Sequence, residues 1–415
     1  MGETDLDRQV ALLMQGTEYG DNALRLAMAV ELRARLADAG RQGRSLRVYC
    51  GFDPRTADLH LGHTVPMRKM RQFQELGHEV IFVIGRFTSL IGDPSDQDVL
   101  RAQLTPEQAT ANAETYAEQA FRILDPARTR IEFNDAWLSP ISLRDWIRLA
   151  SHFTIQQFLT RETFRKRWEA GDPIYLHEFF YAIMQGYDAY HLKTDVQIGG
   201  SDQLFNIVTA GRKLMEALGE RPNIGIILGI LPGTDGVLRM SKSRGNHIPL
   251  NTTPGDMYGK VMSVPDPAMG AYFRLVTRWT PEAIAQMEAD LAAGRLHPRD
   301  AKMHLAREIV EIYFGAAEAG EAEAEFRRVY QQGGAPKAVE DVPVQAGWTL
   351  VDVLASSQAL APSRSEARRL IRQGAVRMGE VTLTDPNLVL EILEPKVIQV
   401  GRYRAARLVP AARPD

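Results

Sequence analysis

The sequence lacks most of the features that mark secreted, metal-clustered or membrane-embedded proteins. Its 415 residues include a single cysteine, Cys50, which excludes an intrachain disulfide and any zinc or iron–sulfur site built from several cysteines. No apolar run is long enough to cross a bilayer as a helix. Residues 1–5 are acidic and lack the basic and then apolar segments that are typical of a signal peptide. We therefore expect a soluble, cytoplasmic protein with no membrane partner.

The chain also lacks a strong charge of either sign. Its 49 Lys and Arg residues nearly balance 52 Asp and Glu residues, which gives a net charge of −3 at pH 7. Any contact with RNA must therefore use local basic patches rather than a general positive field. The hydrophobic share of 45% and the charged share of 24% are ordinary globular values, and the length favours two or three domains.

The first 250 residues do contain a regular alternation of apolar strands and amphipathic helices. We expect strands at residues 48–52, 80–84, 130–134, 196–203 and 224–231. Helices are expected at 6–39 (two), 65–77, 105–123, 142–166, 177–192 and 204–218. This alternation predicts an α/β fold with a doubly wound, Rossmann-like parallel sheet, in which ligands bind where strand ends meet helix starts.

The pattern changes after residue 250. Helical patterns begin at Pro281 and Pro298, each at a first helical position, so we expect an α-helical domain at 251–335. Residues 331–344 contain glycines and prolines and read as a linker. Residues 347–410 combine a short helix with hairpin-like strands, which predicts a small α+β domain.

The first of two chemically informative motifs follows the strand at 48–52. Asp53-Pro54 ends this strand, and His60-Leu61-Gly62-His63 begins a helix. A helix start presents unpaired N–H groups and a positive dipole to phosphate, and two histidines three residues apart could stabilise developing charge on one ligand. Taken alone, a pair of solvated histidines in a surface loop explains the motif equally well.

The second motif lies far downstream, at Arg239-Met240-Ser241-Lys242-Ser243. A central lysine between hydroxyl residues is suited to swing onto a polyphosphate, although such a loop by itself is more often simply solvated. Together, in this order and at this separation, the two motifs resemble the paired signatures of class I aminoacyl-tRNA synthetases. Essentially the whole chain resembles the bacterial tyrosyl-tRNA synthetases.

The resemblance implies a tyrosine pocket. Tyr49 falls where the family's tyrosine bonds the substrate phenol. Tyr181, Gln185 and Asp188 share one helix face; Asp188 would take the substrate hydroxyl, and the other two its ammonium group. Phenylalanine would leave the buried carboxylate and phenol without partners, which excludes it. The resemblance further assigns to tyrosine binding Asp53, Thr88, Asp93, Asn134 and Gln203.

The resemblance also implies two-step chemistry without a protein nucleophile. Tyrosine attacks the α-phosphate of ATP, and the terminal adenosine of tyrosine tRNA then attacks the adenylate; positioning and charge stabilisation carry the rate. The implied catalytic residues are His60, His63, Arg239 and Lys242. The implied ATP contacts are Cys50, Gly51, Gly62, His63, Gly200, Asp202, Met240, Ser241, Lys242 and Ser243. Mg²⁺ is expected to come with ATP, with no dedicated metal site and no tightly bound cofactor.

The C-terminal segment resembles the S4-type RNA-binding module of these enzymes. Ser363 and Glu366 form a capping box at the start of its helix. Basic side chains fall where that module meets RNA, at Arg364, Arg368, Arg369, Arg372 and Arg377. The alternative is a charged, solvated helix in a capping module. The family also implies a homodimer, built through an insertion around residues 100–180, and an anticodon-binding role for the helical domain at 251–335.

Two places depart from the family pattern. Arg55 stands where relatives usually have threonine, and residues 96–98 are Asp-Gln-Asp where relatives often have glycine and a basic residue. These departures keep open a synthetase paralogue that binds RNA but has lost charging. A third interpretation is a ligase that passes an activated amino acid to something other than tRNA, which the C-terminal module argues against.

Overall fold

The computed structural model describes residues 3–54, 59–94, 112, 116, 118–330, 340–357, 360–361, 363–379, 381–401 and 404–411. Arg55, residues 96–98 and most of the helix expected at 105–123 lie outside these ranges. The chain divides into two compact units, Met1–Ala319 and Gly320–Asp415, and each is described by itself. The domain boundary at residue 250 stays a prediction. In the described part of the chain, no helix has the length and apolarity needed to cross a membrane.

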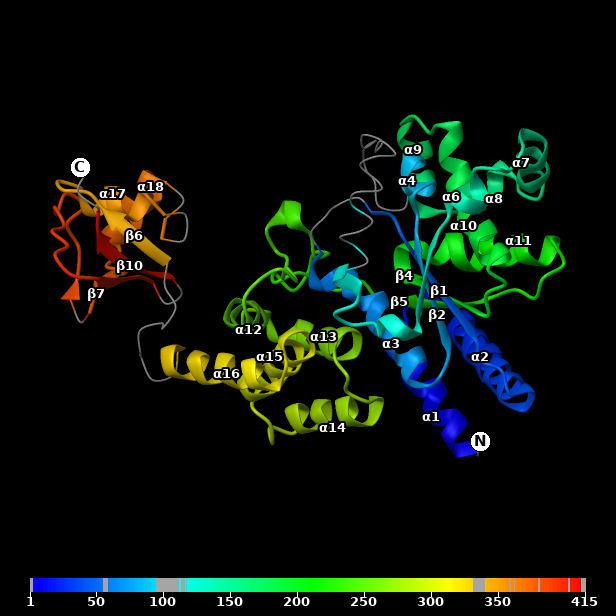
Figure 1. Ribbon diagram of the computed structural model, residues 1–415, viewed down its shortest axis with the longest axis horizontal. Helices are drawn as coiled ribbons and strands as arrows, with labels where there is room; N and C mark the ends of the chain where they lie inside the picture. The colour runs from blue at the N-terminus through cyan, green and yellow to red at the C-terminus, as the bar shows by residue number, and fades with distance from the viewer. Residues whose placement is uncertain are drawn as a thin grey trace. The chain divides into compact units, whose positions relative to one another are not determined.

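The first unit is built on a five-stranded parallel sheet (Figure 1). Its strands are β1 (Arg47–Phe52), β2 (Glu79–Ile84), β3 (Thr129–Phe133), β4 (Val196–Gly200) and β5 (Ile224–Leu228), in the order β3-β2-β1-β4-β5. Every neighbouring pair is parallel, which confirms the doubly wound fold. The chain reverses its direction of winding beside β1, and such a switch point is where ligands bind.

Helices cover both faces of this sheet, and Figure 1 shows α3 on one side and α2 on the other. The helices before and within the sheet are α1 (Glu3–Met14), α2 (Asn22–Gln42), α3 (Thr64–Glu75), α4 (Thr88–Ile91), α6 (Asp135–Leu138), α7 (Leu143–Ala150), α8 (Ile155–Leu159), α9 (Glu162–Ala170), α10 (Leu176–His191) and α11 (Arg212–Ala217). After β5 come α12 (Pro254–Met262), α13 (Met269–Val276), α14 (Pro281–Ala292), α15 (Pro298–Phe314) and α16 (Ala316–Tyr330). Residues 251–330 are therefore helical, as the sequence predicts.

Two predicted helices differ from the structure. The single helix expected at 142–166 is three short helices, α7 to α9, because Thr154 caps a new helix by accepting the N–H of Gln157. The helix expected at 204–218 begins with a π-helical segment, η5 (Phe205–Gly211), before α11. Insertions of this kind are frequent at functional sites, and η5 closely follows the pocket residue Gln203.

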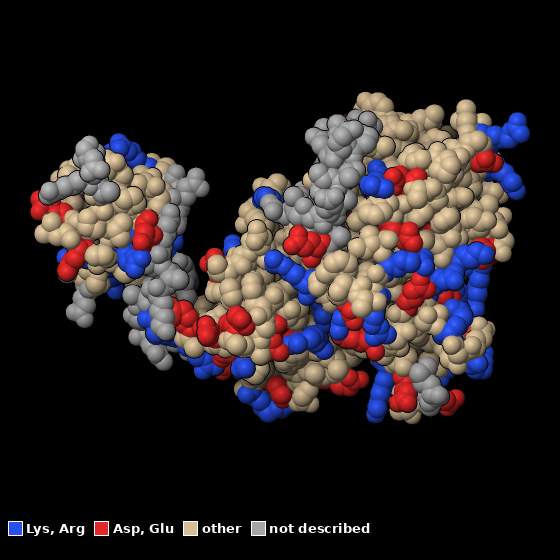
Figure 2. All heavy atoms as spheres, viewed as in Figure 1, with Lys and Arg blue, Asp and Glu red and all other residues tan. Residues whose placement is uncertain are grey.

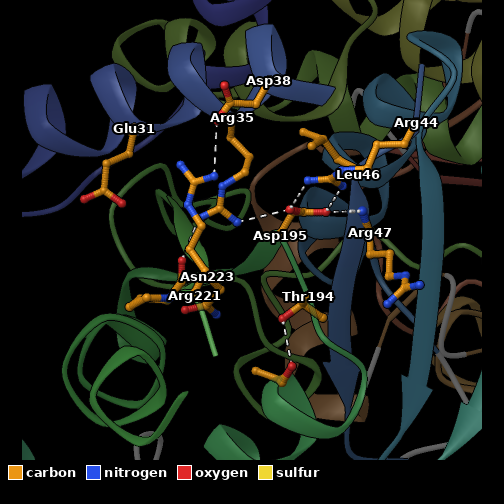
Figure 3. Close-up of polar contacts among 12 residues, drawn as sticks. Glu31, Arg35, Asp38, Arg44, Leu46, Arg47, Thr194, Asp195, Arg221 and Asn223 are labelled. Atoms are coloured by element: carbon orange, nitrogen blue, oxygen red, sulfur yellow. Dashed lines mark hydrogen bonds and ion pairs between the residues drawn. The ribbon is translucent and has the colours of Figure 1, made fainter. Parts of the chain in front are cut away.

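A buried ion cluster lies at the amino-terminal ends of the central strands of the sheet (Figure 3). The Asp195 carboxylate accepts hydrogen bonds from Arg35 at 3.1 Å, from Arg44 at 2.8 and 3.0 Å, and from the backbone N–H of Arg47 at 3.0 Å. Burial alone would raise the pKa of Asp195, but the bonds from Arg44 and Arg47 hold it below its usual value. The cluster joins α2, β1 and β4 at the strand ends opposite the switch-point pocket.

The second unit is a small α+β domain. Its sheet contains β6 (Glu340–Val344), β7 (Val376–Met378), β8 (Val381–Thr382), β9 (Lys396–Val400) and β10 (Arg404–Pro410), in the order β6-β10-β9-β7-β8. Helices α17 (Leu350–Ala355) and α18 (Arg364–Arg372) pack their buried leucines into its core. Because β6 pairs in parallel with β10, residues 340–344 belong to this sheet and not to a linker, which corrects the prediction.

Candidate active site

A pocket opens at the carboxyl ends of β1 and β4, beside the switch point. Residues predicted from distant parts of the chain line it together. They are Tyr49, Cys50, Gly51, Asp53, His60, Gly62, His63, Thr88, Asp93, Asn134, Tyr181, Gln185, Asp188, Gly200, Asp202, Gln203, Arg239 and Met240. Ser241, Lys242 and Ser243 do not line its wall, although they follow Met240 directly on the neighbouring loop.

One deeply buried polar group in the pocket is the carboxylate of Asp188 on α10, which is only 2% exposed. It accepts hydrogen bonds from Trp137 Nε1 at 2.7 Å, Asn134 Nδ2 at 3.3 Å and Tyr49 Oη at 3.4 Å. Burial raises the pKa of Asp188 to about 7, and these three donors oppose the rise. Trp137 was not predicted from the sequence; its place three residues after Asn134, on the next helical turn, is the only signal that marks it.

A second carboxylate, Asp53, lies at the end of β1. Its oxygens accept from Tyr181 Oη at 3.0 Å and from Thr88 Oγ1 at 2.8 Å. Asn134 Nδ2 donates to Thr88 Oγ1 at 3.1 Å, so a chain of polar contacts joins Asp53 to Asp188. Gly85 makes room for this contact, because a Cβ there would lie 2.3 Å from both Asp53 Oδ1 and Thr88 Oγ1.

A third carboxylate, Asp93, is held from two directions. Arg161, between α8 and α9, donates to Asp93 Oδ1 at 3.2 Å, and the amide of Gln203 donates to the other oxygen. Arg161 is 7% exposed and was not predicted, because a lone arginine between two short helices carries no sequence signal. Nearby, Gln185 Oε1 is buried, and no donor among the described residues reaches it. A ligand with an N–H donor would satisfy that acceptor.

The first motif forms the entrance to α3. The rings of His60 and His63 lie 3.8 Å apart, and His63 Nδ1 accepts the backbone N–H of His60 at 3.2 Å. Burial lowers the pKa of His60 to about 3 and that of His63 to about 4, so both rings are neutral at pH 7. His63 therefore carries its proton on Nε2, where it can donate to a ligand.

The segment that follows the second motif lies against the first motif. The backbone N–H of Leu61 donates to Ile248 O at 2.8 Å, and that of Leu250 donates to Leu59 O at 3.0 Å. Arg239 reaches across the pocket to Asp202, with Nη1 3.4 Å from Oδ2. Two segments nearly 180 residues apart in sequence thus form one wall with histidines on one side and a basic loop on the other.

The predicted RNA-binding arginines lie on α18 and β7 of the second unit and fall into two groups. Arg364 pairs with Asp352 at 2.6 Å, and Arg369 pairs with Glu366 at 2.6 Å. The other three are exposed and have no ion pair within the described residues: Arg368, Arg372 and Arg377. The structure therefore presents these three as the more available cations.

Comparison with known proteins agrees with this geometry. Residues 41–331 match the family model "tRNA synthetases class I (W and Y)", and residues 349–392 match the S4 domain. The fold is thus that of a class I aminoacyl-tRNA synthetase. The chain is 45% identical to the tyrosine–tRNA ligase of Moorella thermoacetica, over 98% of this chain and 97% of that protein. It is 43% identical to that of Carboxydothermus hydrogenoformans, over 98% of both. The chain belongs to the tyrosyl-tRNA synthetase family.

A solved structure supports the fold independently. The C-terminally truncated mitochondrial tyrosyl-tRNA synthetase of Aspergillus nidulans aligns with a TM-score of 0.61, over 78% of this chain and 94% of that one. At 24% sequence identity, this likeness supports the arrangement of the elements and says nothing of individual residues.

Proposed function

We propose that this protein activates L-tyrosine with ATP and transfers it to the 3′-terminal adenosine of tyrosine tRNA. The observation that carries the proposal is the Asp188 carboxylate at the base of the pocket, with Tyr49 and Trp137 as donors. A buried carboxylate beside a phenol favours a ligand that supplies a hydroxyl, because an apolar ring would leave both groups without a new partner.

The other polar groups suit the two ends of tyrosine. Asp93 and the unsatisfied Gln185 Oε1 face the same pocket and would accept hydrogen bonds from the substrate ammonium group. The substrate carboxylate would then point toward His60 and His63. The buried carboxylate of Asp188 at one end of the substrate and the partly buried carboxylate of Asp93 at the other fix its direction, which is how a site converts binding into orientation.

In the first step, a tyrosine carboxylate oxygen attacks the α-phosphorus of ATP, the bond to the β-phosphate oxygen breaks, and pyrophosphate leaves. Neutral His60 and His63 donate to the phosphate oxygens, and Arg239 and Lys242 neutralise the β- and γ-phosphates. Cys50, Gly51, Gly200 and Asp202 would contact the nucleoside. Mg²⁺ arrives with ATP as part of the substrate; the described residues hold no cluster of three or more His, Cys, Asp or Glu side chains suited to a metal.

In the second step, a ribose hydroxyl of the tRNA attacks the carbonyl carbon of tyrosyl-adenylate, and AMP leaves. The S4-type unit with Arg368, Arg372 and Arg377 supplies phosphate contacts that hold the tRNA. Such charging serves protein synthesis, which supports the expected cytoplasmic location.

We also infer a homodimer. Exposed apolar side chains gather on α7 to α10, within the predicted insertion: Leu143, Ile147, Ile155, Trp168 and Leu176 are each more than half exposed. In Figure 2, uncharged (tan) surface lies between scattered charged side chains over this part of the unit. Several large exposed apolar side chains on one part of a unit favour a protein interface there. A monomer by light scattering at micromolar concentration would contradict the inference.

The test of the proposed function is tyrosine-dependent exchange between pyrophosphate and ATP, followed by charging of bacterial tyrosine tRNA. Both activities are expected. No exchange by correctly folded protein would overturn the proposal and favour an RNA-binding paralogue. Exchange without charging would indicate a different acceptor for the activated tyrosine.

A further inference from the structure

One buried amide organises the loop that carries the second motif. Asn246 is 6% exposed, and its side chain contacts both ends of the segment 239–241. Its Oδ1 accepts the backbone N–H of Ser241 at 2.8 Å, and its Nδ2 donates to the backbone oxygen of Arg239 at 3.2 Å. The backbone on both sides of Met240 is therefore held by a single side chain.

Asp235 completes the contact from the other side of the loop. The Asn246 amide donates to Asp235 Oδ2, and Asp235 Oδ1 accepts the backbone N–H groups of Val237 at 2.8 Å and Leu238 at 2.7 Å. The bond from Asn246, followed by these two, lowers the pKa of Asp235. The carboxylate thus remains an ionised acceptor at neutral pH.

Gly233 is required by the same packing. A Cβ on Gly233 would lie 2.2 Å from Asn246 Nδ2 and 2.7 Å from the backbone oxygen of Asn246, too close for any side chain. That oxygen also accepts the N–H of Thr234 at 2.8 Å. The loop is therefore closed at its base around one amide, and no larger residue at position 233 fits.

The backbone just beyond Asn246 contacts the first motif. Ile248, two residues beyond Asn246, accepts the backbone N–H of Leu61 between the two histidines. A displacement of Asn246 would move the loop and its anchor beside the histidines together.

We propose that Asn246 and Asp235 are positioning residues that set Arg239 and Lys242 for the polyphosphate of ATP. The proposal rests on the proposed function. It assigns the pair to one step only, because the β- and γ-phosphates leave as pyrophosphate before the tRNA reacts. Loss of the pair should therefore slow activation and weaken ATP binding, and leave tyrosine binding and transfer from preformed adenylate unchanged.

The main variant is Asn246→Asp, which keeps the acceptor for the Ser241 N–H but turns the donor into an oxygen that faces Asp235 and the Arg239 carbonyl. The rescue is the double variant Asn246→Asp with Asp235→Asn, which restores one donor between the two side chains with the roles exchanged. A matched control is Asn223→Ala. Asn223 is likewise buried and donates to Gln197 at 2.7 Å, but it lies outside the loop and the pocket lining.

Activation is measured by single-turnover formation of tyrosyl-adenylate, and transfer by mixing isolated enzyme–adenylate with tRNA. We expect Asn246→Asp to lower the activation rate about 10- to 100-fold and raise the KM for ATP, with the KM for tyrosine and the transfer rate within twofold. The double variant should recover at least a third of the fall in activation rate that Asn246→Asp causes, measured on a logarithmic scale. Asn223→Ala should change the melting temperature, but it should not raise the KM for ATP relative to the KM for tyrosine.

A physical readout of the loop accompanies the kinetics. Arg239, Lys242 and Arg244 are trypsin sites within the loop, and all are exposed. Cleavage at these sites, located by mass spectrometry, should be several-fold faster in Asn246→Asp than in the unmodified protein or the double variant. Equal losses in activation and transfer, or activation unchanged in a folded variant, would overturn the proposal. Absence of exchange in the unmodified protein would instead overturn the proposed function. If Asn246→Asp does not fold, Asp235→Asn alone tests the same contact from its exposed side.

Discussion

The indole Nε1 of Trp137 lies 2.7 Å from Oδ1 of Asp188. This hydrogen bond is the shortest of the three to that carboxylate. Trp137→Phe removes this donor and keeps most of the ring. Because a hydrogen bond to a charged group contributes about 1.5–3 kcal/mol, we expect the dissociation constant for tyrosine to rise at least about 10-fold. Isothermal titration measures this. Trp146→Phe is the control, since Trp146 packs against the same hydrophobic cluster without being among the donors to Asp188.

Tyrosine binding should depend on pH through Asp188. Its pKa is raised to about 7, and the ionised form is the better acceptor for the substrate phenol. Affinity should therefore rise between pH 6 and 8 and level off above that range. A flat profile from pH 5.5 to 8.5 would assign the phenol to another group.

The same shift predicts a stability effect of definite sign. Between its ordinary pKa of 3.8 and the raised value of about 7, the folded state keeps a proton on Asp188 that the unfolded state has lost. The contribution of Asp188 to the free energy of unfolding therefore falls as pH rises through this window. Denaturant unfolding of the unmodified protein and Asp188→Asn at pH 5 and 7.5 measures it, and the variant should lack this part of the dependence.

Arg161 should affect the binding of the tyrosine ammonium group, because it holds Asp93 in place. Arg161→Met breaks its buried pair with Asp93, and removal of one partner of a buried pair is typically costly, about 3–5 kcal/mol. We expect the KM for tyrosine to rise about 100-fold with little change in the KM for ATP. The inhibition constant of 3-(4-hydroxyphenyl)propanoate, which lacks the ammonium group, should change much less. Equal weakening of both ligands would show a general distortion of the pocket, whereas Arg161→Lys should retain part of the affinity.

Substitution of the C-terminal arginines should weaken RNA binding without changing tyrosine activation. Alanine at Arg368, Arg372 or Arg377 should weaken tRNA binding and reduce the slope of log affinity against log salt by about 0.7–0.9 for each phosphate that an arginine no longer neutralises. Pyrophosphate exchange should not change. Arg364→Ala and Arg369→Ala are matched comparisons, because both side chains are already ion-paired; an unchanged salt slope in all five variants would favour a capping role for α18.

Much of the sheet was predictable because its strands are short, nearly all-apolar runs. Residues 80–84 and 224–228 are buried along almost their whole length, and such runs between helices indicate parallel strands. The break of 142–166 into three helices was less visible, since apolar periodicity continues across Thr154. The strand at 340–344 could not be recognised beside Pro343, because only its pairing with β10 defines it.

The family resemblance supplied the candidate pocket residues, and sequence spacing by itself brings only some of them together. Tyr181, Gln185 and Asp188 share a helix face, and the two histidines stand three residues apart. Trp137 and Arg161 were missed because each reaches its carboxylate from a separate element, across about 50 and 70 residues of sequence. A long-range contact to a single side chain leaves no periodic pattern in the chain.

The measurement that tests the central claim most directly is pyrophosphate–ATP exchange with tyrosine and phenylalanine side by side, in the unmodified protein and in Asp188→Ala. We predict strong exchange with tyrosine and none detectable with phenylalanine at equal concentration, and a loss of this discrimination in the variant. No tyrosine-dependent exchange in the unmodified protein would contradict the function, and unchanged rejection of phenylalanine by Asp188→Ala would contradict the pocket.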